Sequence, residues 1–206
     1  MVSPPRLLAA VIGAVLLGSA VPAAAAEITL RATRPGRPPV VLRAEPADAT
    51  WRIRVLDANG RAVQRIEAGD PDQGRPGLRD ADGDGAQDLW VPSMVGNANT
   101  EYELWRMDPA TGRFVPAGTI SGFQFRRDGA WLVAMARNGC CETTYAFHRF
   151  SIAGTLVPAF SIGLRYAEDG KVESCEAAAE ADQPDQAARR RWCAVRPDGA
   201  LPGRGL

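Results

Sequence analysis

The sequence predicts an antiparallel all-β domain, because short alternating strands and tight-turn signals follow one another along most of its length. Residues 51–56 alternate apolar and polar side chains, the pattern of a strand with one buried face. They lead into Asn59 and Gly60, a dipeptide typical of hairpin turns, and residues 61–68 then supply the return strand. Alternation and turn chemistry therefore agree on an antiparallel hairpin.

The rest of the chain repeats this pattern. Residues 69–79, rich in Gly, Pro and Asp, are expected to form a loop. Residues 176–191, rich in alanine and interrupted by Pro184, are expected to be helical, with a solvated loop as the alternative. Further strands are expected at residues 27–32, 40–44, 89–92, 102–107, 113–117, 131–136, 143–152, 156–166 and 172–175.

The first 26 residues have the organisation of an export signal. A single arginine, Arg6, precedes an apolar run, and small residues ending at Ala26 provide an Ala-x-Ala cleavage site. The apolar run is short for a membrane span, so we expect no stable membrane anchor after cleavage. We therefore expect residues 1–26 to be removed, residues 27–196 to form a single domain, residues 197–206 to be a flexible tail, and the protein to be periplasmic or secreted in a bacterium.

Charge and composition argue against several classes of function. The 206 residues contain 24 Lys and Arg and 24 Asp and Glu, for a formal net charge of zero, and no basic block large enough to track nucleic acid. The single histidine, His148, lies in a strand-like segment. The sequence has no nucleophile elbow, zinc-ligand spacing or phosphate loop. We therefore expect a non-enzymatic protein that does not bind nucleic acid.

The four cysteines all follow the export signal, so oxidation is expected. We favour a disulfide between Cys175 and Cys193, which flank one excursion of the chain. For Cys140 and Cys141 we expect a vicinal disulfide in a turn. The alternative is two separate bonds that link a C-terminal hairpin to the core.

Residues 80–89 carry acidic side chains at loop positions 1, 3, 5 and 9 and a glycine, Gly85, at position 6. This spacing is typical of calcium loops, in which alternate side chains of a tight turn point inward and supply oxygen ligands. Position 12 is Val91, so the bidentate glutamate of an EF-hand is missing, and the flanks read as strands. The expected Ca²⁺ ligands are the side chains of Asp80, Asp82, Asp84 and Asp88 and the backbone carbonyl of Ala86.

Such loops also occur in β-propeller blades, but this chain contains a single copy. We therefore expect an irregular or incomplete β-propeller-like domain, with a β-sandwich as the alternative. A second segment of interest is residues 96–105, a polar loop that runs into an aromatic strand. Polar loops on a rigid β scaffold suit insertion into a partner's cleft.

Together, these motifs resemble a family of exported bacterial proteins. The resemblance comprises the acidic loop at residues 80–89, a segment from Gly96 to Trp105 that is similar to a Gly-x-Asn-x-x-Tyr pattern followed by an aromatic strand, a turn at residues 108–114 and the Cys140-Cys141 pair. It covers about a third of the chain, from Leu78 to Ile152. Characterised relatives bind calcium, resemble invertebrate-type lysozyme inhibitors in fold, and act as periplasmic immunity proteins. The acidic loop also resembles those of FG-GAP and VCBS-like repeats.

The resemblance implies that the protein inhibits a lysozyme-like peptidoglycan hydrolase by filling its active-site cleft. Such a cleft holds a protonated glutamate and a second carboxylate. Contact with these acids is expected from Asn97, Asn99 and Tyr102, and less strongly from His148. The alternative is a calcium-stabilised, non-enzymatic binding module for a surface glycan or protein.

Overall fold

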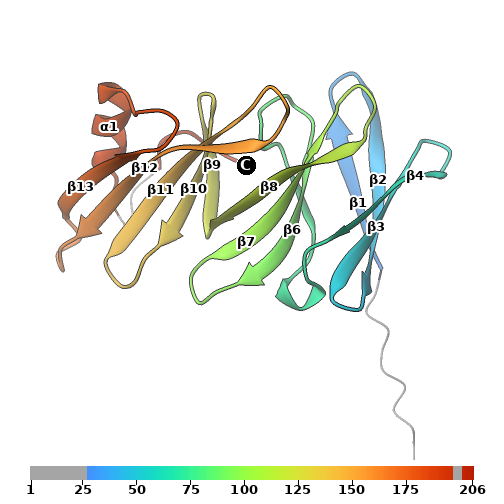
Figure 1. The fold of residues 1–206 in the computed structure, drawn as a ribbon, viewed down its shortest axis with the longest axis horizontal. Coiled ribbons are helices and arrows are strands. Elements are labelled where there is room, and N and C mark those ends of the chain that lie inside the picture. The colour runs from blue at the N-terminus through green and yellow to red at the C-terminus, as the bar shows by residue number, and fades with distance from the viewer. Residues whose placement is uncertain (1–26, 197–200) are drawn as a thin grey trace, which may run out of the picture.

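The computed structural model describes residues 27–196 and 201–206, so the expected export signal lies outside the described residues. The predicted all-β, antiparallel class is confirmed, because every strand pairing in these residues is antiparallel. The strands form three sheets, which we call sheets A, B and C in chain order. Figure 1 shows them side by side, from blue through green to red.

Sheet A holds β1 to β4 in sequence order, with bounds Ile28–Arg34, Arg37–Ala47, Thr50–Leu56 and Ala62–Ala68. The predicted alternation of β3 is confirmed, because Trp51, Ile53 and Val55 are buried while Arg52 is exposed. The predicted hairpin is also confirmed: the Gly60 amide donates to the Asp57 carbonyl at 2.9 Å, and β3 pairs with β4.

Sheet B holds β5 to β8, with bounds Gly77–Arg79, Asp88–Val95, Thr100–Met107 and Phe114–Gly122. The expectation of a loop at residues 69–79 was wrong at its end, because residues 77–79 form β5 and pair with β6. The rest of this segment contains the short 3₁₀ helix η1 (Pro71–Gln73). Pro71 lies in its first turn, and Asp70 caps it by accepting a hydrogen bond from the Asp72 amide.

Sheet C has the strand order β13-β12-β11-β10-β9-β14. The sequence prediction missed two of its strands, β9 and β14, and it placed Ile152 at a strand end where the structure has an exposed turn. The bounds are Gln124–Asp128 for β9, Trp131–Arg137 for β10, Glu142–Phe150 for β11, Leu156–Tyr166 for β12, Val172–Ala179 for β13 and Arg204–Gly205 for β14.

The predicted helix is shorter than expected and begins after Pro184. Helix α1 spans Gln186–Cys193, and Asp185 caps it by accepting from the Ala188 amide at 2.6 Å. Residues expected in the first half of the helix extend β13 instead, because their backbone pairs with β12. Within the expected C-terminal tail, β14 pairs with β9, and the Arg126 side chain donates to the carbonyls of Pro202 and Gly203.

The core lies between consecutive sheets. One apolar cluster joins sheet A to one face of sheet B, and a second joins the other face of sheet B to sheet C. The third cluster packs sheet C against Trp192 of α1. Strand β6 is therefore buried on both faces: Leu89 and Val91 face sheet A, and Trp90 faces sheet C.

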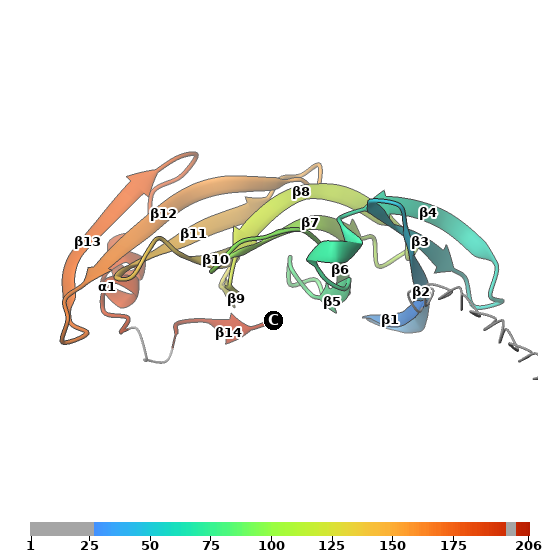
Figure 2. The same ribbon diagram turned by 90° about the horizontal axis from the view of Figure 1, so that it is seen from below.

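The three sheets follow one another around an open arc, with α1 and β14 on its inner side (Figure 2). Within the described residues no strand pairing joins sheet A to sheet C, so the arc does not close into a ring. The middle sheet is held on both sides, and the acidic loop belongs to that sheet.

Candidate functional site

The acidic loop closes the hairpin between β5 and β6. Arg79 pairs with Asp88 across this hairpin, so residues 80–87 form the connection. Gly83 and Gly85 have φ values of 82° and 86°, a left-handed conformation that side chains with a Cβ rarely adopt. The loop therefore uses both of its glycines to reverse direction, where the sequence prediction had singled out Gly85.

Two alanines fix the loop between the sheets. Ala81 is fully buried in the cluster between sheets B and C, and Ala86 is fully buried in the cluster between sheets A and B. The loop is also tied to β1, because the Gln87 amide donates to the Thr33 carbonyl and the Thr33 amide donates to Gln87 Oε1, both at 3.0 Å. The small apolar residues among the acids thus anchor the backbone of the loop.

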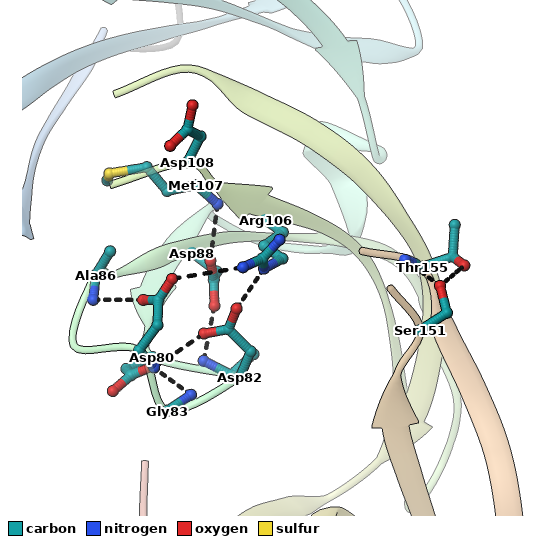
Figure 3. A network of polar contacts seen from close by, with 12 residues as sticks. Asp80, Asp82, Gly83, Ala86, Asp88, Arg106, Met107, Asp108, Ser151 and Thr155 are labelled. Carbon is teal, nitrogen blue, oxygen red and sulfur yellow. Dashed lines mark hydrogen bonds and ion pairs between the residues drawn. The ribbon is translucent and has the colours of Figure 1, made fainter. Parts of the chain in front are cut away.

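Asp88 is fully buried and links the loop to the neighbouring strand. Its Oδ2 accepts a hydrogen bond from the Ala81 amide, and its Oδ1 accepts one from the Met107 amide of β7, both at 2.8 Å (Figure 3). Burial raises the pKa of Asp88 to about 7, although these two hydrogen bonds act in the opposite direction. A buried carboxylate of this kind gains from a nearby positive charge.

The other carboxylates turn back onto the loop's own backbone. Asp80 accepts from the amides of Gly83 at 2.7 Å and Gly85 at 3.3 Å, and Asp82 accepts from the Asp84 amide at 3.1 Å. Asp84 accepts from the Ala86 amide at 2.8 Å. These three carboxylates lie close to one another and to Asp88, so their negative charges repel one another.

Three of these residues could hold a metal ion. Asp80, Asp82 and Asp88 each offer a carboxylate oxygen, and these oxygens lie within 4.8 Å of one another. An all-oxygen set of this kind fits a hard divalent cation. Asp84 lies outside this group, and burial raises its pKa. Ala86 lies near the end of the loop, and its amide donates a hydrogen bond to Asp84 Oδ1.

Arginines from distant segments of the chain lie around the acidic loop. These contacts were not predicted from the sequence. Arg106 of β7 donates from Nε to Asp82 Oδ2 in a close ion pair, and its guanidinium lies 3.6 Å from Asp84 Oδ2 (Figure 3). Arg127 of β9 is 8% exposed and donates to the Ala81 carbonyl at 2.8 Å. Arg204 of β14 lies 3.8 Å from Asp80. No local sequence pattern links these arginines to the loop.

The residues expected to contact a partner have different surroundings. Asn97 is exposed, at the turn between β6 and β7. Asn99 is half-buried, and its side-chain amide exchanges two hydrogen bonds with the backbone of Arg137 in sheet C. Tyr102 is half-buried, with its ring edge-on to Trp90 and Phe125 at centroid distances of 5.6 and 5.5 Å. These contacts make Asn99 and Tyr102 part of the scaffold beneath the turn.

His148 lies within β11, where it pairs with Leu132 of β10 and Pro158 of β12. Its Nδ1 is buried without a hydrogen-bond partner among the described residues. Burial lowers the pKa of His148, and the nearby backbone of Ala146 and Leu132 and the charge of Glu180 offset this shift in part. His148 is therefore set into the sheet, away from the β6–β7 turn in sequence and in strand pairing.

Two apolar side chains beside Asn97 were not singled out from the sequence. Met94 is 62% exposed and Val95 is 49% exposed, although both belong to β6, whose first five residues are buried. The Val95 amide donates to Gln73 Oε1 at 2.7 Å, which braces the turn against η1. We call residues 94–99 the β6–β7 tip. In Figure 1 it lies at the opposite end of β6 from the acidic loop.

Both disulfide predictions are confirmed: Cys140 is bonded to Cys141, and Cys175 to Cys193. Cys193 lies at the end of α1, so the second bond joins a helix to β13. Two disulfides suggest an oxidising environment outside the cytoplasm. In the part of the chain that the structure describes, no helix has the length and apolarity needed to span a membrane.

Comparison with protein-family models, curated proteins and solved structures finds no match to this chain.

Proposed function

We propose that this is an exported calcium-binding protein that inhibits a lysozyme-like peptidoglycan hydrolase by inserting its β6–β7 tip into the active-site cleft. The observation that carries the proposal is the tip itself. Met94 and Val95 at the end of β6, and Asn97 in the turn that follows, are exposed, and the base of the tip is fixed on both sides. The motif resemblance between Leu78 and Ile152, which includes this tip, supplies the class of partner.

Rigidity supports this role. Gln73 braces one side of the tip and Asn99 ties the other side to sheet C, so little conformational freedom is left to lose on binding. Beneath the tip, Tyr102 packs in the aromatic cluster with Trp90 and Phe125. A turn that is already ordered before binding is well suited to insertion into a cleft.

The chemistry of the tip also matches such a cleft. A lysozyme-like site pairs a protonated glutamate with an ionised carboxylate. An exposed amide such as that of Asn97 both donates and accepts hydrogen bonds, so it can satisfy either acid. Met94 and Val95 would supply apolar contact, and a flexible methionine side chain adapts well to an irregular surface.

Calcium is the ion we assign to the acidic loop. The candidate ligands are oxygen atoms only, and calcium accepts more ligands and less regular geometry than magnesium. Asp80, Asp82 and Asp88 would hold the ion, which would offset the repulsion among the carboxylates and the cost of burying Asp88. The loop lies at the far end of β6 from the tip, so calcium would stabilise the middle sheet of an incomplete propeller and would not touch the target.

The test is inhibition of peptidoglycan lysis by purified lysozyme-like hydrolases from bacterial envelopes. We expect the native protein to inhibit one of them, and Met94→Ser together with Asn97→Ala to weaken inhibition at least tenfold while the melting temperature stays unchanged. Ile152→Ser is the matched control, because Ile152 is another exposed apolar residue but lies on the turn between β11 and β12. Equal inhibition by the native protein and the tip variant would contradict the proposal. Retention on cell-wall glycan without inhibition of any hydrolase would favour the binding-module alternative.

A further inference from the structure

The two disulfides of this protein differ in what they connect. Cys175 and Cys193 are 18 residues apart, and both pack against the apolar cluster between sheet C and α1. Cys140 and Cys141 are sequence neighbours, and both are exposed at the turn between β10 and β11. The first bond fastens a helix to a sheet, whereas the second fastens no distant parts of the chain together.

A bond between neighbours has little effect on the unfolded chain. Disulfides stabilise proteins largely by closing a loop and so restricting the unfolded ensemble, and a sequence separation of 1 leaves almost no loop to close. The Cα atoms are 3.8 Å apart. This is below the separation of about 4.4–6.8 Å that disulfides usually adopt. Stabilisation of the fold therefore does not account for this bond.

The turn keeps its shape by other contacts. The Asn138 amide donates to the Glu142 carbonyl at 3.0 Å, and the Asn138 side chain donates to Thr144 Oγ1 at 2.6 Å. The Tyr166 amide donates to the Cys141 carbonyl at 2.9 Å. Since backbone bonds hold both ends of the turn, breaking the sulfur–sulfur bond leaves it anchored.

The sulfur atoms are also accessible to a reaction partner. Cys140 and Cys141 line an open groove of about 500 Å³, together with Met135, Arg137, Tyr166 and Glu168. Thiol–disulfide exchange needs an attacking thiolate to reach one sulfur atom directly, so access decides which bonds react. Cys175 and Cys193, each half-buried, are less open to such attack.

We propose that Cys140 and Cys141 form a reversible thiol–disulfide site whose substrate is a dithiol, such as the reduced Cys-x-x-Cys pair of an exported oxidoreductase. One thiolate of the dithiol attacks one sulfur atom, which forms a mixed disulfide and releases the other cysteine as a thiolate. The second thiol of the dithiol then displaces the first cysteine. Two electrons and two protons pass to Cys140 and Cys141, and the dithiol becomes a disulfide.

The experiment is a titration of the folded protein with dithiothreitol, followed by alkylation with iodoacetamide and peptide mass spectrometry. We expect Cys140 and Cys141 to be alkylated at dithiothreitol concentrations about tenfold lower than Cys175 and Cys193, since exposed disulfides in unfavourable geometry are the labile ones. The near-UV circular dichroism spectrum should be retained at that point, and oxidised glutathione should restore the bond.

Two double variants separate the contributions of the two disulfides to stability. The double variant Cys140→Ser/Cys141→Ser should melt within about 2 °C of the native protein, whereas Cys175→Ser/Cys193→Ser should melt roughly 6–12 °C lower. The proposal is overturned if all four cysteines become reactive at the same dithiothreitol concentration. It is also overturned if Cys140 and Cys141 react only once the spectrum shows unfolding.

Discussion

Asn99 and Arg137 join two sheets through a pair of hydrogen bonds. The Asn99 Nδ2 donates to the Arg137 carbonyl at 3.0 Å, and the Arg137 amide donates to Asn99 Oδ1 at 2.9 Å. The Asn99 side chain thus hydrogen-bonds both backbone groups of Arg137 at the end of β10, as a neighbouring strand would. The contact fixes the base of the β6–β7 tip to sheet C, and it turns a residue that reads as part of a flexible loop into a structural link.

Replacement of this link should loosen the tip. We expect Asn99→Ala to lower the free energy of unfolding by about 1–2 kcal/mol, because two hydrogen bonds are lost near the surface. Amide hydrogen exchange at Val95 and Gly96 should become faster. Asn97→Ala is the matched control, since Asn97 is exposed in the same turn, and its effect should stay within about 0.5 kcal/mol. Urea denaturation and hydrogen exchange measure both effects, and equal stabilities for the two variants would contradict the bridging role.

Tyr102 combines a packed ring with a hydroxyl group, and two substitutions separate them. Tyr102→Ala should cost about 2–3 kcal/mol, because the ring contacts Trp90 and Phe125 and lies 5.8 Å from the Arg79 guanidinium. Tyr102→Phe keeps the ring and should change stability by less than about 1 kcal/mol. Chemical denaturation of both variants measures this difference. A hydrolase that is inhibited equally by the native protein and Tyr102→Phe would remove the hydroxyl from the expected target contacts.

Arg106 is paired with Asp82, one of the three residues that could hold a metal ion. Calcium bound at the loop would compete with the Arg106 guanidinium for this carboxylate. We expect Arg106→Gln to destabilise the calcium-free protein by about 1 kcal/mol, because the acidic side chains lose a positive neighbour, and to change the calcium-bound protein less.

The difference between the melting temperatures in CaCl₂ and EGTA should therefore be larger for Arg106→Gln than for the native protein. Arg113→Gln removes an exposed arginine beyond the end of β7 and serves as the control. A smaller calcium effect in Arg106→Gln would show that Arg106 assists metal binding.

We expect His148 to make the fold sensitive to acid. Its pKa is lowered by burial in the folded protein, whereas the unfolded chain titrates near the usual value of about 6.5. Below that pH the unfolded chain binds a proton that the folded protein excludes, so the free energy of unfolding falls as the pH falls. Above that pH the histidine is neutral in both states and has no effect.

Urea denaturation at pH 7.5 and pH 5.5 should therefore show a smaller loss of stability for His148→Gln than for the native protein. The sequence contains no other histidine, so the difference between the two proteins isolates this group. An identical loss in both proteins would contradict the assignment of acid sensitivity to His148.

Local patterns were sufficient to predict most of the strands. The alternation in β3 and the turn at Asn59 and Gly60 follow from neighbouring residues, and the structure has both. β9 was missed because its short sequence contains consecutive arginines, and one of them, Arg127, is buried where it contacts the acidic loop. Residues 177–179 have high helix propensity, yet pairing with β12 overrides it.

The candidate metal site was predictable only in part, because some of its contacts come from residues that are distant in the sequence. The spacing of the acidic residues identified Asp80, Asp82 and Asp88, because one loop contains all three. The contacts of Arg106, Arg127 and Arg204 with that loop depend on how β7, β9 and β14 are arranged in space. Likewise, the buried Asp88 carboxylate accepts a hydrogen bond from the Met107 amide, which lies on the adjacent strand.

The most direct test of the account is a pair of thermal melts of the purified, folded protein, in millimolar CaCl₂ and in EGTA. At a calcium concentration about a hundredfold above the dissociation constant, binding should add about 2.7 kcal/mol and raise the melting temperature by roughly 5–10 °C. Asp80→Asn should reduce this shift strongly, whereas Asp72→Asn, an exposed aspartate in η1, should leave it intact. Identical melting of the native protein in calcium and in EGTA would contradict a calcium-binding role for the loop.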